Sequence, residues 1–230
     1  MKSLNLLKLS RNVHGAAGFE SNAKMRASIL TVASPTSSLN RWSGPVLITV
    51  MILLLAMLGE GARVQLSFER TGLESGQMWR LLTAHFVHLG HYHALLNMLG
   101  LLALLVLCPQ ALSFFEWMRR ILLLSLTTSA ALYFLSPQIT SYVGFSGVIH
   151  GLFLLGLVPM VRSRDLIACA CLLYLLGKIA WESYAGAPLS DELAIGGRVV
   201  TQSHLFGTLA GLIYGLIFGS FRKEQGVSES

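Results

Sequence analysis

Six apolar segments constrain the fold of this 230-residue chain more than any other feature of the sequence. They lie near residues 44–58, 92–108, 121–135, 145–161, 166–181 and 203–221. Lipid offers no hydrogen-bond partners to an open backbone, so each segment is expected to be an α-helix. Several are shorter than the roughly 20 residues that cross a bilayer, and local thinning would cover the difference. The sequence therefore predicts an all-α membrane protein with a bundle of six transmembrane helices.

The composition supports this class. Charged residues make up 12% of the chain, whereas soluble domains carry about 25%. We expect a polar, basic cytoplasmic tail over 1–41, a membrane domain over 42–222 and a short polar tail over 223–230. Met25 is an alternative start within the first tail. Three cysteines lie in or beside apolar runs and are expected to be buried thiols rather than disulfides.

The basic residues predict the orientation. If the first tail is cytoplasmic, that side also carries Arg119, Arg120, Arg162, Arg164, Arg222 and Lys223. The other side carries Arg63, Arg70, Arg80 and Arg198. The positive-inside rule then places both termini in the cytoplasm, and it explains the net charge of +6 without nucleic acid. Lys178, near the end of the fifth segment, is expected to extend outward to the interface.

This topology brings the beginnings of the second, fourth and sixth segments to the outer face. The fourth begins with Gly144-Phe145-Ser146-Gly147. Glycines let a substrate backbone approach closely, and the free N–H groups of a helix start suit an oxyanion. Alone, this motif is a weak signal, and a capped helix with packing glycines is the favoured interpretation.

His204 changes that balance, because it is the one histidine of the last segment. The residues that follow repeat glycine every fourth position, at Gly207 and Gly211 and beyond. Such faces let membrane helices touch closely, and the fourth segment has its own small residues at Gly147 and at 151. If the two faces meet, Ser146 and His204 approach each other within proton-transfer distance. The simpler alternative is a histidine bound to a loop carbonyl.

Four histidines, His85, His88, His91 and His93, could instead form a metal or haem site. No carboxylate lies among them, however, and their spacing crosses a loop-to-helix boundary. His93 and Asn97 are four residues apart and share a helical face, so both are expected to donate hydrogen bonds to an oxyanion beside Ser146. The other three are interpreted as loop structure, and neither metal nor cofactor is expected.

Two further features are given supporting roles. His150 lies one turn after Ser146, and is expected to stack on or hydrogen-bond to the His204 imidazole rather than to act as the base. Trp79-Arg80 precedes the second segment, where Arg80 is expected to anchor a loop carbonyl or a lipid phosphate.

Together these motifs resemble the rhomboid family of intramembrane serine proteases, over about residues 75–220. The motifs are Trp79-Arg80, His93-x-x-x-Asn97, Gly144-x-Ser146-Gly147 and His204-x-x-Gly207-x-x-x-Gly211. The resemblance implies a six-helix fold and a Ser146/His204 dyad without a third acid. It also implies an oxyanion hole from His93, Asn97 and the Ser146 N–H, near Gly144, and cleavage of transmembrane segments near the outer face.

One departure refines the resemblance, because rhomboids usually carry an aromatic residue at the position of His150. The segment Gly-Phe-Ser-Gly-Val-Ile-His-Gly is similar to the rhombosortase subfamily. That similarity implies a bacterial inner membrane and single-span substrates with Gly-Gly, transmembrane, basic C-terminal sorting tails. The alternative is an inactive rhomboid-like protein that binds membrane clients without cutting them.

Overall fold

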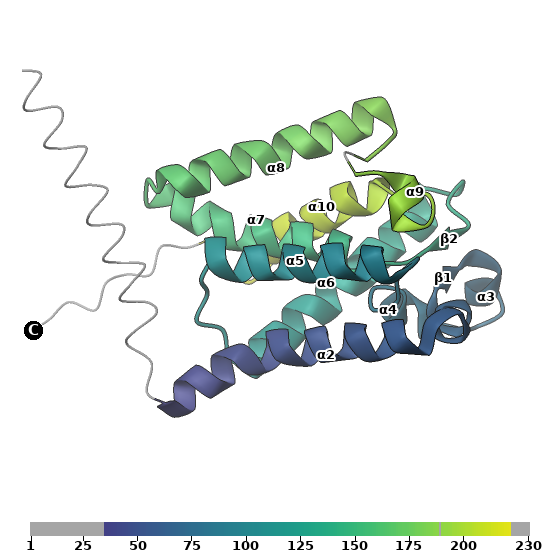
Figure 1. The fold of residues 1–230 in the computed structure, drawn as a ribbon. Helices are drawn as coiled ribbons and strands as arrows, with labels where there is room; N and C mark the ends of the chain where they lie inside the picture. The colour runs from purple at the N-terminus through teal and green to yellow at the C-terminus, as the bar shows by residue number, and fades with distance from the viewer. Residues whose placement is uncertain (1–34, 189, 222–230) are drawn as a thin grey trace, which may run out of the picture. The chain divides into compact units, whose positions relative to one another are not determined.

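The computed structural model describes residues 35–188 and 190–221, and these are mostly helical (Figure 1). The all-α expectation is therefore confirmed for the described residues. The chain divides into two units, residues 1–39 and 40–230. The second unit contains every described helix and strand except the first five residues of the first described helix. Most of the tail predicted over 1–41, and the tail over 223–230, lie outside the described residues.

A helix overlaps each of the six predicted segments. The six are α2 (Pro35–Leu66), α5 (His91–Leu107), α6 (Phe114–Leu135), α7 (Ser146–Arg162), α8 (Leu166–Ala185) and α10 (Gln202–Ile217). Short helices α3 (Arg70–Glu74), α4 (Arg80–Thr83) and α9 (Glu192–Ile195) lie in the connections. The bounds differ most at α2, which begins within the segment predicted as a tail and has non-helical backbone at Gly59.

Among the described residues, three helices are long and apolar enough to cross a membrane: Trp42–Leu66 within α2, together with α6 and α8. Helices α5 and α7 have 17 residues each and α10 has 16, or about 24–26 Å at 1.5 Å per residue. The chain therefore has the helices of an integral membrane protein.

Helices α7 and α10 form the centre of the bundle, between α8 and α6 (Figure 1). Their glycines permit this pairing. A Cβ added to Gly147 would lie 2.7 Å from the Ser203 carbonyl oxygen, and one added to Gly211 would lie 2.8 Å from the Gly151 Cα. Gly207 likewise lies against the backbone of Gly147. The two helices touch through their backbones, as the spacing of the small residues predicted.

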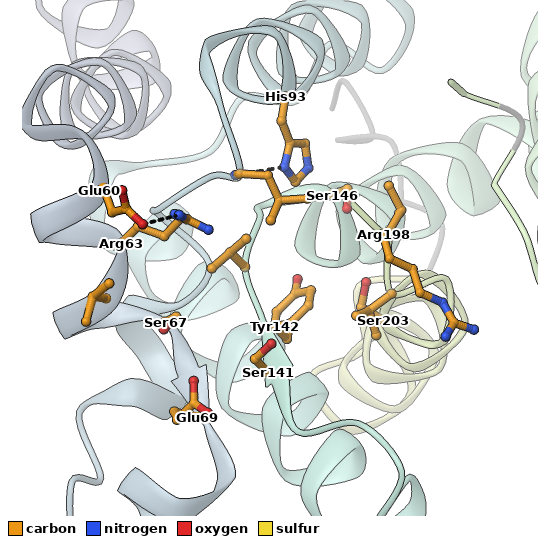
Figure 2. Close-up of a pocket in the computed structure, with 15 residues that line it drawn as sticks. Glu60, Arg63, Ser67, Glu69, His93, Ser141, Tyr142, Ser146, Arg198 and Ser203 are labelled. Atoms are coloured by element: carbon orange, nitrogen blue, oxygen red, sulfur yellow. Dashed lines mark hydrogen bonds and ion pairs between the residues drawn. The ribbon is translucent and has the colours of Figure 1, made fainter. Parts of the chain in front are cut away.

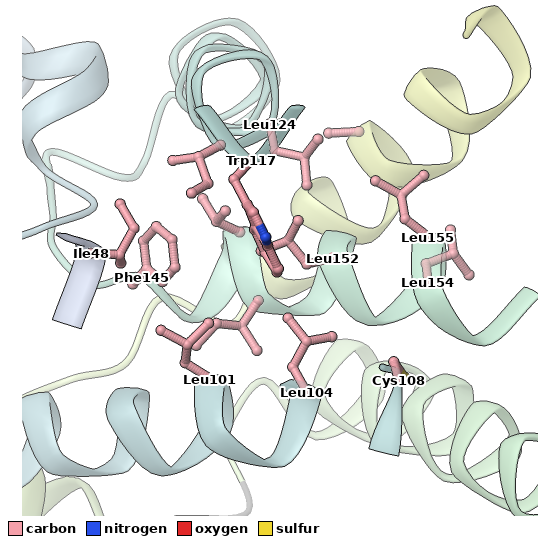
Figure 3. Packing of buried hydrophobic residues seen from close by; sticks show 14 of the residues in the cluster. Ile48, Leu101, Leu104, Cys108, Trp117, Leu124, Phe145, Leu152, Leu154 and Leu155 are labelled. Atoms are coloured by element: carbon pink, nitrogen blue, oxygen red, sulfur yellow. The ribbon is translucent and has the colours of Figure 1, made fainter. Parts of the chain in front are cut away.

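Large apolar side chains fill the space around this pair (Figure 3). Trp117 of α6 is 2% exposed and lies among Leu104 of α5, Leu124 of α6 and Leu152 of α7. From Gly147 to Leu157 every α7 residue except Phe153 is buried. Helix α7 is thus enclosed by protein, which fixes the position of its first residue.

Two arginines hold the connection between α2 and α5 in place. The Arg80 guanidinium donates to the carbonyls of Ser67, at 2.7 Å, and Val64, at 3.1 Å, near the end of α2. Arg70 donates to the Tyr133 carbonyl at 3.1 Å and to others at the end of α6. Next to Arg70, strand β1 (Phe68–Glu69) pairs antiparallel with β2 (Ser141–Tyr142). These contacts tie the approach to α7 to the rest of the bundle. Of the two partners considered for Arg80, the structure shows the loop carbonyl.

Candidate active site

Ser146 is the first residue of α7 and follows a sharp change of backbone direction. Gly144 has φ +119°, a conformation that favours glycine. Its N–H donates to the Ala84 carbonyl at 3.0 Å, and its carbonyl accepts from the Tyr142 hydroxyl. Burial raises the pKa of Tyr142, which keeps that hydroxyl a neutral donor. The turn therefore holds Ser146 at a helix start, where the first N–H groups lack intrahelical acceptors.

Gly147 and Gly151 of α7 lie against Gly207 and Gly211 of α10, and this contact is called the glycine seam. The glycine seam brings His204 of α10 to Ser146. His204 Nε2 lies 2.9 Å from Ser146 Oγ, within the distance needed for proton transfer. These residues are 58 positions apart in the sequence, and both are at least partly buried. The sequence reasoning predicted this approach, and the structure brings the two atoms together.

His150 lies flat against His204. Their ring centroids are 4.2 Å apart and the planes differ by 11°. His150 Nδ1 lies 2.7 Å from the Ser146 carbonyl oxygen. The ring therefore donates from Nδ1 and presents Nε2 as an acceptor, which lies 3.2 Å from Lys178 Nζ. His150 thus restrains the His204 ring and does not reach the Ser146 hydroxyl.

Glu182 and Lys178, both on α8, complete the group of side chains around His204. The sequence pattern did not predict a role for Glu182. Glu182 Oε2 lies 2.7 Å from His204 Nδ1, and Glu182 Oε1 accepts from Lys178 Nζ at 2.5 Å. The expectation that Lys178 extends outward is wrong, because its side chain is 18% exposed and points at this cluster. The resemblance implies a Ser146/His204 dyad without a third acid, whereas the structure places the Glu182 carboxylate against His204. The sequence does contain a signal for this pair, because a Lys and a Glu four residues apart share one face of the helix. Charged side chains in an apolar membrane helix mark functional groups.

His93 and Asn97 are buried side chains of α5, and both line a cavity that Ser146 also lines. A Cβ at Gly144 would lie 2.8 Å from His93 Cε1, so the ring packs directly over that turn. His93 Nδ1 accepts from the Leu89 N–H at 3.3 Å. Asn97 Nδ2 donates to the His93 carbonyl at 2.9 Å, while Oδ1 is buried without a hydrogen-bond partner.

Two cavities meet at Ser146. A polar one of about 340 Å³ is lined by His93, Tyr142, Ser203 and Arg198 among others (Figure 2). An apolar one of about 570 Å³ lies against α5, α7 and α8 and includes Asn97, His150 and His204. The nucleophile position is thus open to a polar space on one side and to an apolar groove on the other.

The other three histidines of the stretch from 85 to 93 lie between the end of α4 and the first residue of α5. His85 is fully buried, with Nε2 3.0 Å from the Ser125 carbonyl oxygen and 2.9 Å from Ser129 Oγ. Burial lowers its pKa to about 4. His88 packs edge-on to His93 with 5.0 Å between centroids, and burial lowers its pKa to about 3. His91 is exposed. Trp79 is also exposed, at 53%, and lies beside the Arg80 anchor rather than at Ser146.

One group of side chains in the described part of the chain has the spacing of a metal site, and it lies outside the stretch from His85 to His93. His150, Glu182 and His204 have donor atoms within 4.8 Å of one another. The Lys178 ammonium lies 3.3 Å from His204 Nδ1 and 3.2 Å from His150 Nε2. A cation is thus already present where a metal ion would bind, which disfavours a metal.

A comparison with known sequence families matches residues 75–221 to the Rhomboid domain. This match covers well over half of the chain and includes every residue of the group around Ser146. The chain belongs to the rhomboid family. Rhomboids are intramembrane serine proteases that act on membrane proteins within the bilayer. A comparison with curated proteins gives no match.

Proposed function

We propose that this rhomboid is an active serine endopeptidase in which Ser146 is the nucleophile and His204 the general base. The observation that carries the proposal is the 2.9 Å distance between Ser146 Oγ and His204 Nε2. Ser146 Oγ attacks the scissile carbonyl while His204 Nε2 takes its proton, and His204 then protonates the leaving amine. Water attacks the acyl-enzyme in the second half of the reaction.

The negative oxygen of the tetrahedral intermediate needs donors that are already in place. The Ser146 N–H lies at a helix start, and the His93 ring packs over the Gly144 turn beside it. His93 and Asn97 supply side-chain donors. In the free enzyme Asn97 Nδ2 is bound to the His93 carbonyl, so it reaches the oxyanion after a side-chain rotation. Catalytic hydrogen bonds commonly form only once substrate is bound.

The two cavities suit the two reactants. The apolar groove beside α5 and α8 matches a transmembrane segment in lipid, and the polar cavity matches the water that the reaction consumes. Both reach Ser146. A substrate segment lying in the groove would place its polar end at the nucleophile, as cleavage near the outer face of a membrane requires.

We further propose that the domain, taken as 42–222, crosses the membrane six times with both termini in the cytoplasm of a bacterium. Helices α5, α7 and α10 are short for a bilayer of about 30 Å, but α7 is enclosed by protein and need not match the lipid thickness. The excess of Lys and Arg on one side sets the orientation. The proposed substrates are exported proteins with single-span Gly-Gly sorting tails, in keeping with the segment around Ser146 and His150.

A reporter carrying a Gly-Gly, transmembrane, basic tail tests the proposal when it is coexpressed with the protein. We expect cleavage with wild type and none with Ser146→Ala. Ser163→Ala is the matched control, because Ser163 is exposed at the far end of the same helix. If wild type leaves the reporter intact but reacts with a fluorophosphonate, the sorting-tail assignment is wrong and the protease assignment stands. If it does neither, the chain is an inactive client-binding rhomboid.

A further inference from the structure

Helix α8 carries two charged side chains toward the protein interior. Most of its surface is apolar and exposed, at Leu173, Tyr174 and Trp181. Lys178 and Glu182 lie four residues apart and therefore share a face, and Glu182 is only 2% exposed. Charges inside a membrane domain are costly and mark functional groups. Buried ion pairs contribute little to stability. Stability alone therefore does not explain why Lys178 and Glu182 are buried together.

Each oxygen of the Glu182 carboxylate has its own partner. Oε2 lies 2.7 Å from His204 Nδ1, and Oε1 lies 2.5 Å from Lys178 Nζ. His204 in turn presents Nε2 to Ser146 Oγ. The contacts form one chain, from the Lys178 ammonium through the carboxylate and the imidazole to the Ser146 hydroxyl.

We propose that Glu182 is a positioning residue for the His204 base, and that Lys178 fixes the orientation of Glu182. This inference rests on the proposed function. The carboxylate accepts from Nδ1–H, which leaves the Nε2 lone pair free to take the Ser146 proton. When that proton moves to Nε2, the imidazole becomes a cation beside an ionised carboxylate that stabilises it. The proton on Nδ1 stays there throughout, and the carboxylate remains ionised.

Lys178 determines what an amide would do at position 182. A Lys ammonium has only donors, so in a Glu182→Gln variant it selects the amide oxygen. The amide NH₂ then faces His204 Nδ1 and requires that atom to be an acceptor. The ring proton moves to Nε2, where it blocks proton transfer from Ser146. A wrong tautomer of this kind costs about 10⁴-fold in kcat in serine proteases.

Removing Lys178 as well should reverse part of this loss. In a Lys178→Met, Glu182→Gln double variant no cation holds the amide oxygen. The amide can then turn its oxygen to Nδ1–H and restore the productive tautomer. The double variant is therefore expected to be more active than Glu182→Gln alone. A purely structural role predicts the opposite, because two lost buried contacts would damage the protein more than one.

The experiment measures the rate of fluorophosphonate labelling and the kcat and KM for a cleaved reporter, with purified full-length protein in detergent. The variants are Glu182→Gln, Glu182→Asp and the double variant. Glu74→Gln is the control, since Glu74 is exposed on α3. Thermal midpoints are recorded for all. We expect Glu182→Gln to lose about 10³–10⁴-fold in kcat with little change in KM. Glu182→Asp should retain more activity than Glu182→Gln, and the double variant should regain at least tenfold over Glu182→Gln.

Three results for the variants would overturn the inference. One is wild-type labelling of Glu182→Gln; another is a double variant that is no better than the single one. The third is an activity loss matched by loss of the fold, with Glu182→Asp no better than Glu182→Gln. If wild type itself neither labels nor cleaves, the proposed function fails instead. Loss of labelling on addition of a metal chelator to wild type would favour a metal at His150, Glu182 and His204 and would also overturn the proposal.

Discussion

The glycine seam between α7 and α10 gives a prediction whose size follows from the structure. Gly211 lies seven residues from His204, about 10 Å along α10, so its substitution touches no reacting group. A Cβ there would lie 2.8 Å from the Gly151 Cα. Carbon atoms in contact lie about 3.5–4.0 Å apart, so Gly211→Ala must open the seam by about 0.7–1.2 Å. The obstacle is backbone and cannot rotate away.

This opening has two expected consequences. Overpacking of a tight contact costs about 1–3 kcal/mol, of which the better helix propensity of alanine offsets about 1 kcal/mol. The larger effect is on geometry, because the Ser146–His204 distance of 2.9 Å then exceeds the reach of proton transfer. A displacement of about 1 Å costs on the order of 10²-fold in rate. We therefore expect Gly211→Ala to lose about 10²-fold in fluorophosphonate labelling rate, with a lower thermal midpoint.

Gly177→Ala is the matched control for this change. Gly177 lies within α8, and a Cβ there would meet no atom within 4 Å. It should label at the wild-type rate with an equal or higher thermal midpoint. If Gly211→Ala behaves like Gly177→Ala in both assays, the close contact of the two helices does not set the geometry of Ser146 and His204, and the reasoning is refuted.

Two further predictions concern acid stability and the oxyanion. Since the pKa of His85 is lowered to about 4 by burial, the unfolded chain takes up a proton near pH 6.5 that the folded chain does not, so stability falls as the pH drops from about 6.5 to 4. At pH 5 the loss in the free energy of unfolding is about 2 kcal/mol. The thermal midpoint of His85→Gln should therefore fall less between pH 7 and pH 5 than that of wild type. An equal fall in the two proteins would contradict this role of His85. Asn97→Ala should lower kcat by about 10²–10³-fold with little change in KM, and an unchanged kcat would exclude Asn97 as an oxyanion donor.

The sequence predicted the helices and the meeting of Ser146 with His204 because both depend on simple periodicity. Apolar runs set the helices, and glycines four apart set the face on which α10 meets α7. The apolar runs do not predict the exact residues at which the helices begin and end. Helix α2 extends past its apolar run on both sides, and the two-residue strands β1 and β2 are too short to leave a pattern.

Glu182 was missed for a related reason. The apolar run ends at Trp181, which leaves Glu182 outside the predicted segment, and the position of Lys178 near the end of that run predicts a side chain that extends to the interface. Whether a charge near a helix end turns inward depends on partners from other helices, here His150 and His204. Those partners are distant in the sequence, and only the packing of α8 against α7 and α10 brings them together.

The most direct test of the central claim is labelling of the purified protein by a fluorophosphonate, with the modified residue identified by mass spectrometry. The account predicts a single adduct on Ser146 in wild type, and none in Ser146→Ala or His204→Ala. Absence of labelling in wild type, or equal labelling in Ser146→Ala, would contradict it.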